Sequence, residues 1–188
     1  AMPGHKGLLG PQGTGLLLCG RDPEPLMQGG TGSLSIQQDM PDFLPDRGEA
    51  GTVNVPGICG LAAGMTHIRH VGLKAIAARE EREAMRAAQG LAGLGLRVFT
   101  GPHQAGVLSF LPPDGDCETA AERFAARGVA LRAGVHCAPT AHESAGTLET
   151  GTVRASFGPD ASPEQTRGFL QTAAALWGGK TGQKVARM

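Results

Sequence analysis

Two clusters of reactive side chains stand out in this sequence, an amine in the first and a thiol with two guanidinium groups in the second. The amine belongs to Lys6, which lies in the segment Gly4–Gly15, where five of twelve residues are glycine. An amine kept partly desolvated near another cation has a lowered pKa and can condense with an aldehyde. Taken alone, a lysine in a glycine-rich loop is more often solvated, so these residues permit aldehyde chemistry without requiring it.

The second cluster places the thiol of Cys137 between Arg132 and Arg154, directly after His136. The planar guanidinium fork of arginine suits a substrate carboxylate. Positive charge nearby, including that of a protonated His136, favours the thiolate that attacks sulfur. By itself a His-Cys pair is more often structural, because a free cysteine usually packs as a small apolar residue.

The elements that must position the lysine are irregular. Residues 1–57 read as loops around one short buried strand, Leu16–Cys19, which is bounded by glycines, and no amphipathic helix is visible there. Such a segment is not expected to fold alone. Two consecutive helices are predicted next, the first from Pro56 to about His70 and the second with apolar positions between Leu73 and Leu91.

The elements around the thiol alternate between strands and helices. After the two helices, the order strand, strand, helix, strand, strand, helix predicts a compact α/β layer structure with its own core from about residue 71. The predicted elements are strands Leu96–Phe99 and Gly106–Phe110, a helix Cys117–Arg127 between Asp116 and Gly128, strands Val129–Arg132 and Thr152–Phe157, and a last helix from Ser162.

Composition limits the classes of partner and of compartment. The 188 residues include 17 Lys plus Arg and 17 Asp plus Glu, so no single-sign field predicts binding to nucleic acid or to an anionic membrane. The sequence has no apolar run near the roughly 20 residues that span a bilayer and no signal-peptide start. Its four cysteines form no CxxC pair, and we expect reduced thiols in a soluble, cytoplasmic protein.

Several motifs resemble those of one family, the class V aminotransferases and cysteine desulfurases. Gly4–Gly15 is similar to the family's lysine segment, in which a His-Lys pair is followed by Gly-Pro and Gly-x-Gly before a strand. Glu49–Gly57 resembles its Glu-Ala-Gly-Thr-x-Asn loop, and Gly29–Ser33 resembles the glycine turn before that loop. Leu131–Pro139 and Gly151–Phe157 resemble the segments that carry the sulfur-accepting cysteine and the carboxylate-binding arginine.

The resemblance implies a fold and a cofactor. The fold would be the α/β type I fold of the pyridoxal-phosphate-dependent transferases. Residues 1–70 would form the end of its large domain, residues 71–177 the small C-terminal domain, and residues 178–188 a flexible tail. Pyridoxal 5'-phosphate would be held by Lys6 with His5 beside it. Thr52 would contact the phosphate across the interface of a homodimer.

The resemblance also implies an activity and its partners. Lys6 would move protons while Cys137 takes the sulfur of L-cysteine as a persulfide, with alanine as the product. Arg154 would bind the carboxylate of this amino acid, with Arg132 as a second contact. A sulfur-acceptor protein would be a further partner.

Three alternatives remain open at this point. The thiol does not exclude an aminotransferase or another pyridoxal-phosphate lyase. The family's large domain starts well before its lysine, and the acid that pairs with the pyridine nitrogen has no counterpart here. We therefore expect a truncated chain that is crippled in catalysis and exposes apolar surface on residues 1–57. A non-catalytic α/β interaction module is the third alternative.

Weaker patterns predict little chemistry. Ala174–Thr181 fits a relaxed phosphate-loop pattern, but a predicted helix precedes it where a strand is needed. His67 with His70, or His136 and Cys137 with His142, lack the spacing of a four-ligand set, so no metal is expected. The charged run Arg79–Glu83 is interpreted as a solvated helix face.

Overall fold

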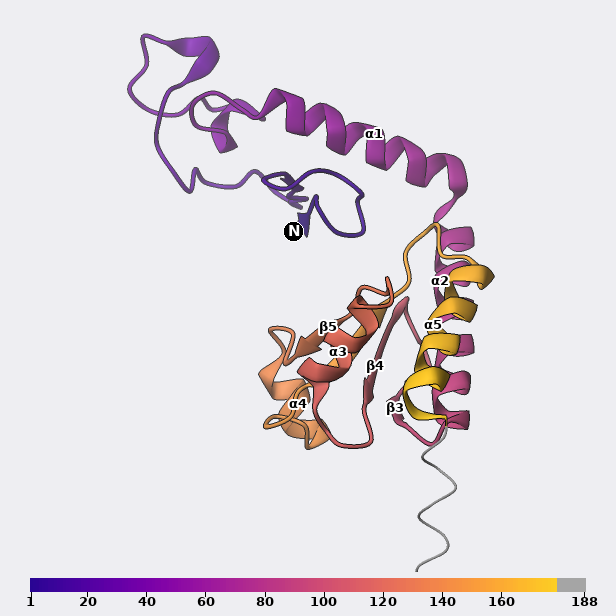
Figure 1. Ribbon diagram of the computed structural model, residues 1–188. Coiled ribbons are helices and arrows are strands. Elements are labelled where there is room, and N and C mark those ends of the chain that lie inside the picture. The colour runs from indigo at the N-terminus through magenta and orange to yellow at the C-terminus, as the bar shows by residue number, and fades with distance from the viewer. Residues whose placement is uncertain (179–188) are drawn as a thin grey trace, which may run out of the picture. The chain divides into compact units, whose positions relative to one another are not determined.

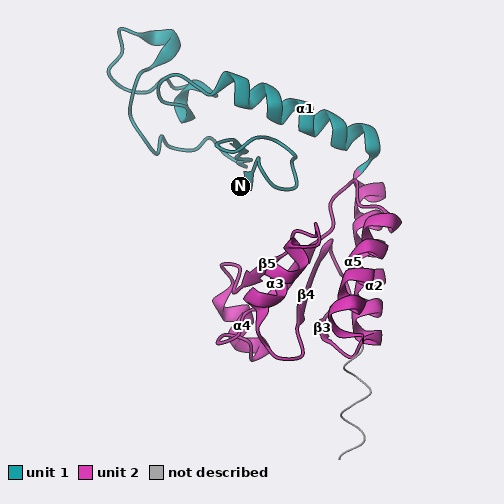
Figure 2. Cartoon of the chain, in the orientation of Figure 1, with its two compact units in different colours: residues 1–72 teal, residues 73–188 magenta. Residues whose placement is uncertain are grey.

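The computed structural model describes residues 1–178 and divides the chain into two compact units, Ala1–Gly72 and Leu73–Met188 (Figure 1, Figure 2). The predicted tail, apart from Gly178, lies outside the described residues, as does the end of the segment that fits the phosphate-loop pattern. None of the helices within residues 1–178 has both the length and the apolar character needed to cross a membrane.

Unit 1 is mostly irregular, as predicted. Its strands are β1 (Met2–Pro3) and β2 (Gly15–Leu16), which pair antiparallel, and its short 3-10 helices are η1 (Gly32–Leu34) and η2 (Asp46–Gly48). The predicted buried strand Leu16–Cys19 is wrong. Because β1 offers only two residues for pairing, the ladder ends at Leu16, and Leu17 and Leu18 are 67% and 76% exposed.

Large apolar side chains of unit 1 are exposed, which agrees with the expectation for residues 1–57. Leu26 is 98% exposed and Ile36 is 99% exposed. The unit's one long helix, α1 (Val55–Val71), follows the predicted bounds closely. The Asn54 side chain caps its start by accepting a hydrogen bond from the Gly57 amide at 3.1 Å, and the chain leaves the helix at Gly72, whose φ is +90°.

Unit 2 is built on a four-stranded antiparallel sheet with the order β3-β4-β6-β5. Its strands are β3 (Arg97–Phe99), β4 (Val107–Leu111), β5 (Arg132–Gly134) and β6 (Thr152–Ser156). Its helices are α2 (Leu73–Gly93), α3 (Cys117–Ala125), α4 (Pro139–Ala145) and α5 (Pro163–Trp177), and α2 lies beside α5 (Figure 1).

An aromatic cluster fills the core between one face of this sheet and the helices α2, α3 and α5. Phe110 of β4 lies 6.4, 6.2 and 6.3 Å, centroid to centroid, from the rings of Phe124, Phe169 and Trp177. Edge-to-face contacts at these distances are favourable for aromatic rings. Since side chains alternate along a strand, the residues between the buried positions of β4 and β6 point to the opposite face of the sheet.

Two predicted elements near the thiol differ from the structure. The strand predicted at Val129–Arg132 begins only at Arg132, because the Val129 amide bonds to the Phe124 carbonyl at 3.0 Å and completes the end of α3. Helix α4 was not predicted, although Pro139 in its first turn and Gly146 after its end, with a φ of +67°, are typical signals of a helix.

The interpretation of Arg79–Glu83 as a solvated face is wrong at Glu83, which is fully buried. Its carboxylate accepts hydrogen bonds from the Thr166 hydroxyl at 2.8 Å and from Arg86 at 3.0 Å. The reason is that α5 packs against α2 and covers this position, which no pattern within α2 alone reveals. Glu83 therefore joins the two helices through a polar contact inside the unit.

Replacing Glu83 with alanine is expected to lower the free energy of unfolding by about 1–3 kcal/mol, because the buried polar contact between α2 and α5 is lost and the Thr166 hydroxyl keeps only the Ser162 carbonyl as a partner. Urea unfolding followed by circular dichroism measures this loss. Glu81→Ala, at an exposed position of the same helix, is the matched control and should change stability by less than about 0.5 kcal/mol. Equal effects of the two substitutions would contradict the structural role of Glu83.

Candidate active site

Lys6 lies exposed in a loop of unit 1 whose ends are tied together by backbone hydrogen bonds. The Gly4 amide donates to the Thr14 carbonyl at 2.7 Å, and the Gly10 amide donates to the Gly4 carbonyl at 2.8 Å. Within the loop, the Leu9 amide donates to the Lys6 carbonyl at 2.9 Å. The amine is thus presented by a short backbone framework and not by a regular helix or strand.

Three glycines of α1, Gly57, Gly60 and Gly64, let the lysine loop approach this helix closely. A Cβ atom at Gly64 would lie 2.5 Å from the Leu8 carbonyl oxygen, and one at Gly60 would lie 3.1 Å from Pro11 Cδ. Their spacing of three and four residues puts them on one helix face. This glycine face was not predicted, although glycines repeated at this spacing inside a predicted helix are a readable signal of close packing.

Gly64→Ala is expected to loosen the lysine loop, because the added methyl group would overlap the Leu8 carbonyl and outweigh the gain in helix propensity of about 1 kcal/mol. Hydrogen–deuterium exchange of residues 4–14 should become several-fold faster. Gly93→Ala in α2 is the control, since a Cβ there meets nothing within 4 Å, and it should leave the exchange unchanged. Unchanged exchange in Gly64→Ala would contradict the packing role.

Thr52 lies in a second glycine-containing loop of unit 1. The Gly51 amide donates to the Gly30 carbonyl at 2.8 Å, so the two segments that carry the family-like glycine turn and the Thr52 loop lie side by side. Gly51 has a φ of +81°, which favours glycine. The side chains of Thr52 and His5 are both exposed. Unit 1 thus holds Lys6, His5 and Thr52.

Unit 2 holds the other predicted site residues, and the sheet brings its two arginines together. Arg132 of β5 lies directly opposite Arg154 of β6, and Ser109 of β4 lies opposite Arg154 on its other side. Directly opposed side chains of an antiparallel pair share one face, and like charges there repel. No ion pair within residues 1–178 involves either guanidinium group, so an anion bound between them would relieve the repulsion.

Cys137 is exposed in the tight turn that follows β5. The turn is closed by a hydrogen bond of 2.9 Å from the Ala138 amide to the Val135 carbonyl. His136 and Cys137 both have positive φ values, +53° and +60°, which are uncommon for residues other than glycine. By contrast Cys117 is buried, and this burial, together with the charge of Asp116, raises the pKa of its thiol.

The His136 imidazole is held by the neighbouring strand. Its Nε2 lies 3.1 Å from the Thr152 carbonyl oxygen, and because a carbonyl can only accept, Nε2 carries the hydrogen. Burial lowers the pKa of His136, and the positive charges of Arg154 and Arg132 lower it further against the effect of this hydrogen bond. The neutral form is therefore favoured near neutral pH. The lowered pKa does not favour the protonated His136 that was expected to assist the thiolate, so any such help would come from the arginines.

A small cavity of about 160 Å³ lies on the same sheet face, next to the position of Arg154. Its sheet side is formed by Phe99, Ser109 and Thr152, and its other side by α4 and the residues after it. Thr152 is 3% exposed, and its hydroxyl has no hydrogen-bond partner within residues 1–178. The space is open to solvent and mostly apolar, and it meets the arginine strand at Thr152, two residues before Arg154 on the same face of β6.

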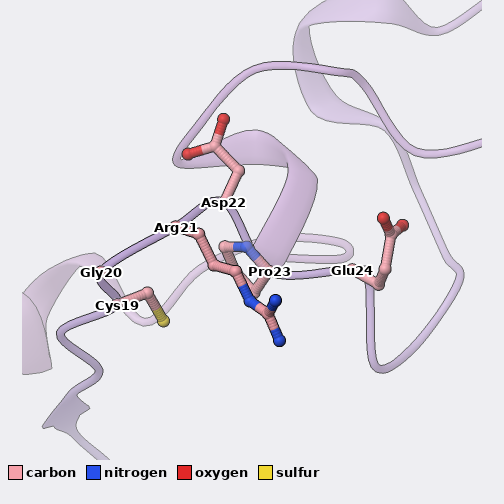
Figure 3. A pocket seen from close by; sticks show the side chains of 6 residues that line it. All are labelled: Cys19, Gly20, Arg21, Asp22, Pro23 and Glu24. Atoms are coloured by element: carbon pink, nitrogen blue, oxygen red, sulfur yellow. The ribbon is translucent and has the colours of Figure 1, made fainter.

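A larger open hollow of about 660 Å³ in unit 1 is lined by the consecutive residues Cys19–Glu24 (Figure 3). The carboxylates of Asp22 and Glu24 point away from the Arg21 guanidinium group in this view. Glu24 instead pairs with Arg47 at 2.8 Å. The hollow therefore lies along a single loop, and its polar side chains do not converge on a common position where a ligand could bind.

Metal-binding geometry is not found among residues 1–178, where no group of three or more His, Cys, Asp and Glu side chains could hold an ion. The rings of His136 and His142 are 6.0 Å apart, centroid to centroid. The Nδ1 atom of His142 is already hydrogen-bonded, because it lies 2.8 Å from the hydroxyl of Thr147, just after α4.

The chain is similar in sequence to a known family of proteins. The family model for class V aminotransferases matches residues 1–169. A probable cysteine desulfurase of Methanothermobacter thermautotrophicus is 36% identical over 172 residues, and one of Pyrococcus abyssi is 34% identical over 180 residues. These alignments cover 84% and 90% of this chain but 42% and 44% of the relatives, so the chain spans less than half of their length.

Solved structures give the same result for the fold. The apo cysteine desulfurase of Thermococcus onnurineus NA1 superposes with a TM-score of 0.79 at 32% identity and covers 94% of this chain and 46% of its own. A cysteine desulfurase of Escherichia coli gives 0.69 at 28% identity, covering 81% and 38%. The chain thus has part of the α/β type I fold of pyridoxal-phosphate-dependent transferases, which confirms the predicted fold.

The match over residues 1–169 also settles the family. The chain belongs to the class V aminotransferases, a family of pyridoxal-phosphate-dependent enzymes.

Proposed function

We propose that the chain forms part of a pyridoxal-phosphate-dependent cysteine desulfurase in which Cys137 accepts the sulfur of L-cysteine. The observation that carries this proposal is the pair of opposed guanidinium groups, Arg132 and Arg154, on the strands that flank the exposed thiol turn. A carboxylate bound by this pair would place an amino acid beside a sulfur nucleophile. The cysteine desulfurases among the relatives agree with this assignment.

Arg154 is proposed to bind the substrate carboxylate, with Arg132 as its second contact. A guanidinium group offers two parallel N–H donors to a carboxylate, and such charged hydrogen bonds are among the strongest in proteins. Arg154 comes from the middle of β6, whose neighbouring residues Val153 and Ala155 are buried in the core. Its backbone is therefore held in place before a substrate arrives.

Cys137 is proposed to act as a thiolate that attacks the substrate sulfur. A sulfur–sulfur bond forms on Cys137 as the carbon–sulfur bond of cysteine breaks, and the electron pair of that bond stays with the carbon skeleton, which takes up a proton to give alanine. When bound, pyridoxal phosphate supplies the electron withdrawal that makes this cleavage accessible. The product on the protein is a persulfide, which a sulfur-acceptor protein would then discharge.

The residues of unit 1 fit the cofactor by their chemistry. Lys6 offers an exposed amine on a loop closed by hydrogen bonds, which suits condensation with an aldehyde and later proton transfer. Thr52 offers an exposed hydroxyl that can donate to a phosphate, and His5 lies next to the lysine in sequence. As in the family resemblance, Thr52 is proposed to serve the partner subunit of a homodimer, with residues 1–70 in the large domain and 71–177 in the small one.

The arginine pair is tested by alkylating Cys137 in a background where the other exposed cysteines, Cys19 and Cys59, are serine. Iodoacetate carries a carboxylate and iodoacetamide does not, so their rate ratio reports the local charge. Arg154→Gln should lower the ratio about threefold, since a nearby unit charge in water-like surroundings contributes roughly 0.6 kcal/mol. The exposed Arg127→Gln is the control, and an unchanged ratio in Arg154→Gln would contradict the carboxylate site.

The role of the thiol is tested by supplying pyridoxal phosphate and L-cysteine and measuring alanine together with the mass of the Cys137 peptide. Any alanine that the original chain forms, however slowly, should be matched by an equal amount of sulfur gained on Cys137. Cys137→Ser should lose both, whereas Cys59→Ser should keep both. Product formation that survives Cys137→Ser would instead support an aminotransferase or a lyase that does not use this thiol.

A further inference from the structure

The turn that presents Cys137 adopts a conformation that its own residues disfavour. Left-handed backbone costs roughly 1–2 kcal/mol for a residue that carries a Cβ, and here His136 and Cys137 adopt it in succession. Such conformations persist only where the surroundings hold them. The glycine before them, Gly134, lies at the end of β5 and does not relieve the strain at the two following residues. Contacts from outside the turn must therefore maintain it.

One such contact is the hydrogen bond from His136 Nε2 to the Thr152 carbonyl, 16 residues away in sequence. Thr152 lies opposite Gly134 in the ladder and two residues before Arg154, on the same face of β6. The imidazole is half-buried, and its ring closes the corner between the end of β5 and the start of β6. This bond links the turn that carries the thiol to the strand that carries the guanidinium group.

A second anchor holds the other side of the turn. Helix α4 begins two residues after Cys137 and ends where the Thr147 amide donates to the His142 carbonyl at 2.9 Å. The Gly151 amide then donates to the Thr147 carbonyl at 2.8 Å and returns the chain to β6. Cys137 therefore lies between a helix that is fixed at its far end and the imidazole of His136.

We propose that His136 is a positioning residue that latches the Cys137 turn to β6 and so holds the thiol at a fixed place beside Arg154. The proposal rests on the proposed roles of Cys137 and Arg154. The latch is formed by the neutral ring, whose Nε2–H bonds to Thr152 while Nδ1 stays unprotonated.

The surroundings of His136 make the latch sensitive to acid. Its buried Nδ1 has no hydrogen-bond partner within residues 1–178, and the groups that face the ring are Arg154, Arg132 and His142. Protonation would bury a second N–H donor and place a third positive charge beside the two arginines. Because burial holds the pKa of His136 below its usual value, the unfolded chain binds this proton more readily. The folded turn with its buried ring is therefore most stable above about pH 6.5 and becomes less stable as the pH falls through the lowered pKa, although Nε2–H stays a donor to Thr152.

The test measures backbone order at Cys137 and Ala138 by ¹⁵N relaxation in the 188-residue chain. His136→Gly removes the ring but accepts positive φ, so a loss of order reports the latch and not the backbone preference. The order parameters of the two amides should fall from about 0.85 to below about 0.6. Thr152→Val is the matched control, because it keeps the carbonyl that accepts the bond, and it should leave both values unchanged.

Two further measurements keep the proposal falsifiable. In His136→Gly the iodoacetate to iodoacetamide ratio at Cys137 should also fall about threefold, as in Arg154→Gln, because the thiol leaves the guanidinium groups. Lowering the pH of the unsubstituted chain from 7 toward 5 should reduce order at Cys137 and Ala138 before the core amides of Leu108 and Val153 change.

Order parameters in His136→Gly equal to those of the unsubstituted chain would overturn the proposal. So would an acid titration in which the turn and the core lose order together. Relaxation requires no turnover, so a latch that is confirmed in a chain without desulfurase activity would leave this inference standing while the proposed function fails.

Discussion

The antiparallel pairing of β5 with β6 is the interaction on which the candidate site depends. It sets Arg132 opposite Arg154 and Gly134 opposite Thr152, so the two arginines and the start of the thiol turn share two neighbouring strands. Side chains alternate between the faces of a sheet, so a register shift of one residue would turn Arg132 toward the core. The position of the Cys137 thiol thus depends first on the hydrogen-bonded pairing of β5 with β6 and only secondarily on its own turn.

The apolar core keeps this register in place. Val153 and Ala155 of β6 are buried, as are Leu108 and Phe110 of β4, and the rings of α3 and α5 pack around Phe110. Slipping the strand would expose these side chains, at a cost of about 1.5–3 kcal/mol for each large one. The same burial that stabilises the unit therefore decides which face carries Arg154.

The lysine loop in unit 1 is held in a different way, by backbone packed against backbone. Gly57, Gly60 and Gly64 leave a bare face on α1, and the loop from Gly4 to Thr14 lies on it. Close contact of this kind needs small residues on both sides, and glycine is abundant both in the lysine loop and on the facing side of α1. The two units therefore position an amine and a thiol by distinct means, glycine contact in one and strand pairing in the other.

The sequence by itself determined the local features whose signals lie within a short stretch of chain. Helices α1, α2, α3 and α5, strands β3, β4 and β6, and the motifs around Lys6, Thr52, Cys137 and Arg154 were readable because capping, periodicity and motif spacing act over a few residues. Only the tertiary structure decided the start of β5, the burial of Glu83 beneath α5 and the contact of His136 with Thr152 that accompanies its lowered pKa. The burial of Glu83 and the state of His136 depend on partners 83 and 16 residues away and on removal from water, which local sequence does not encode. The start of β5 depends on how α3 ends at Phe124 and on the pairing with β6.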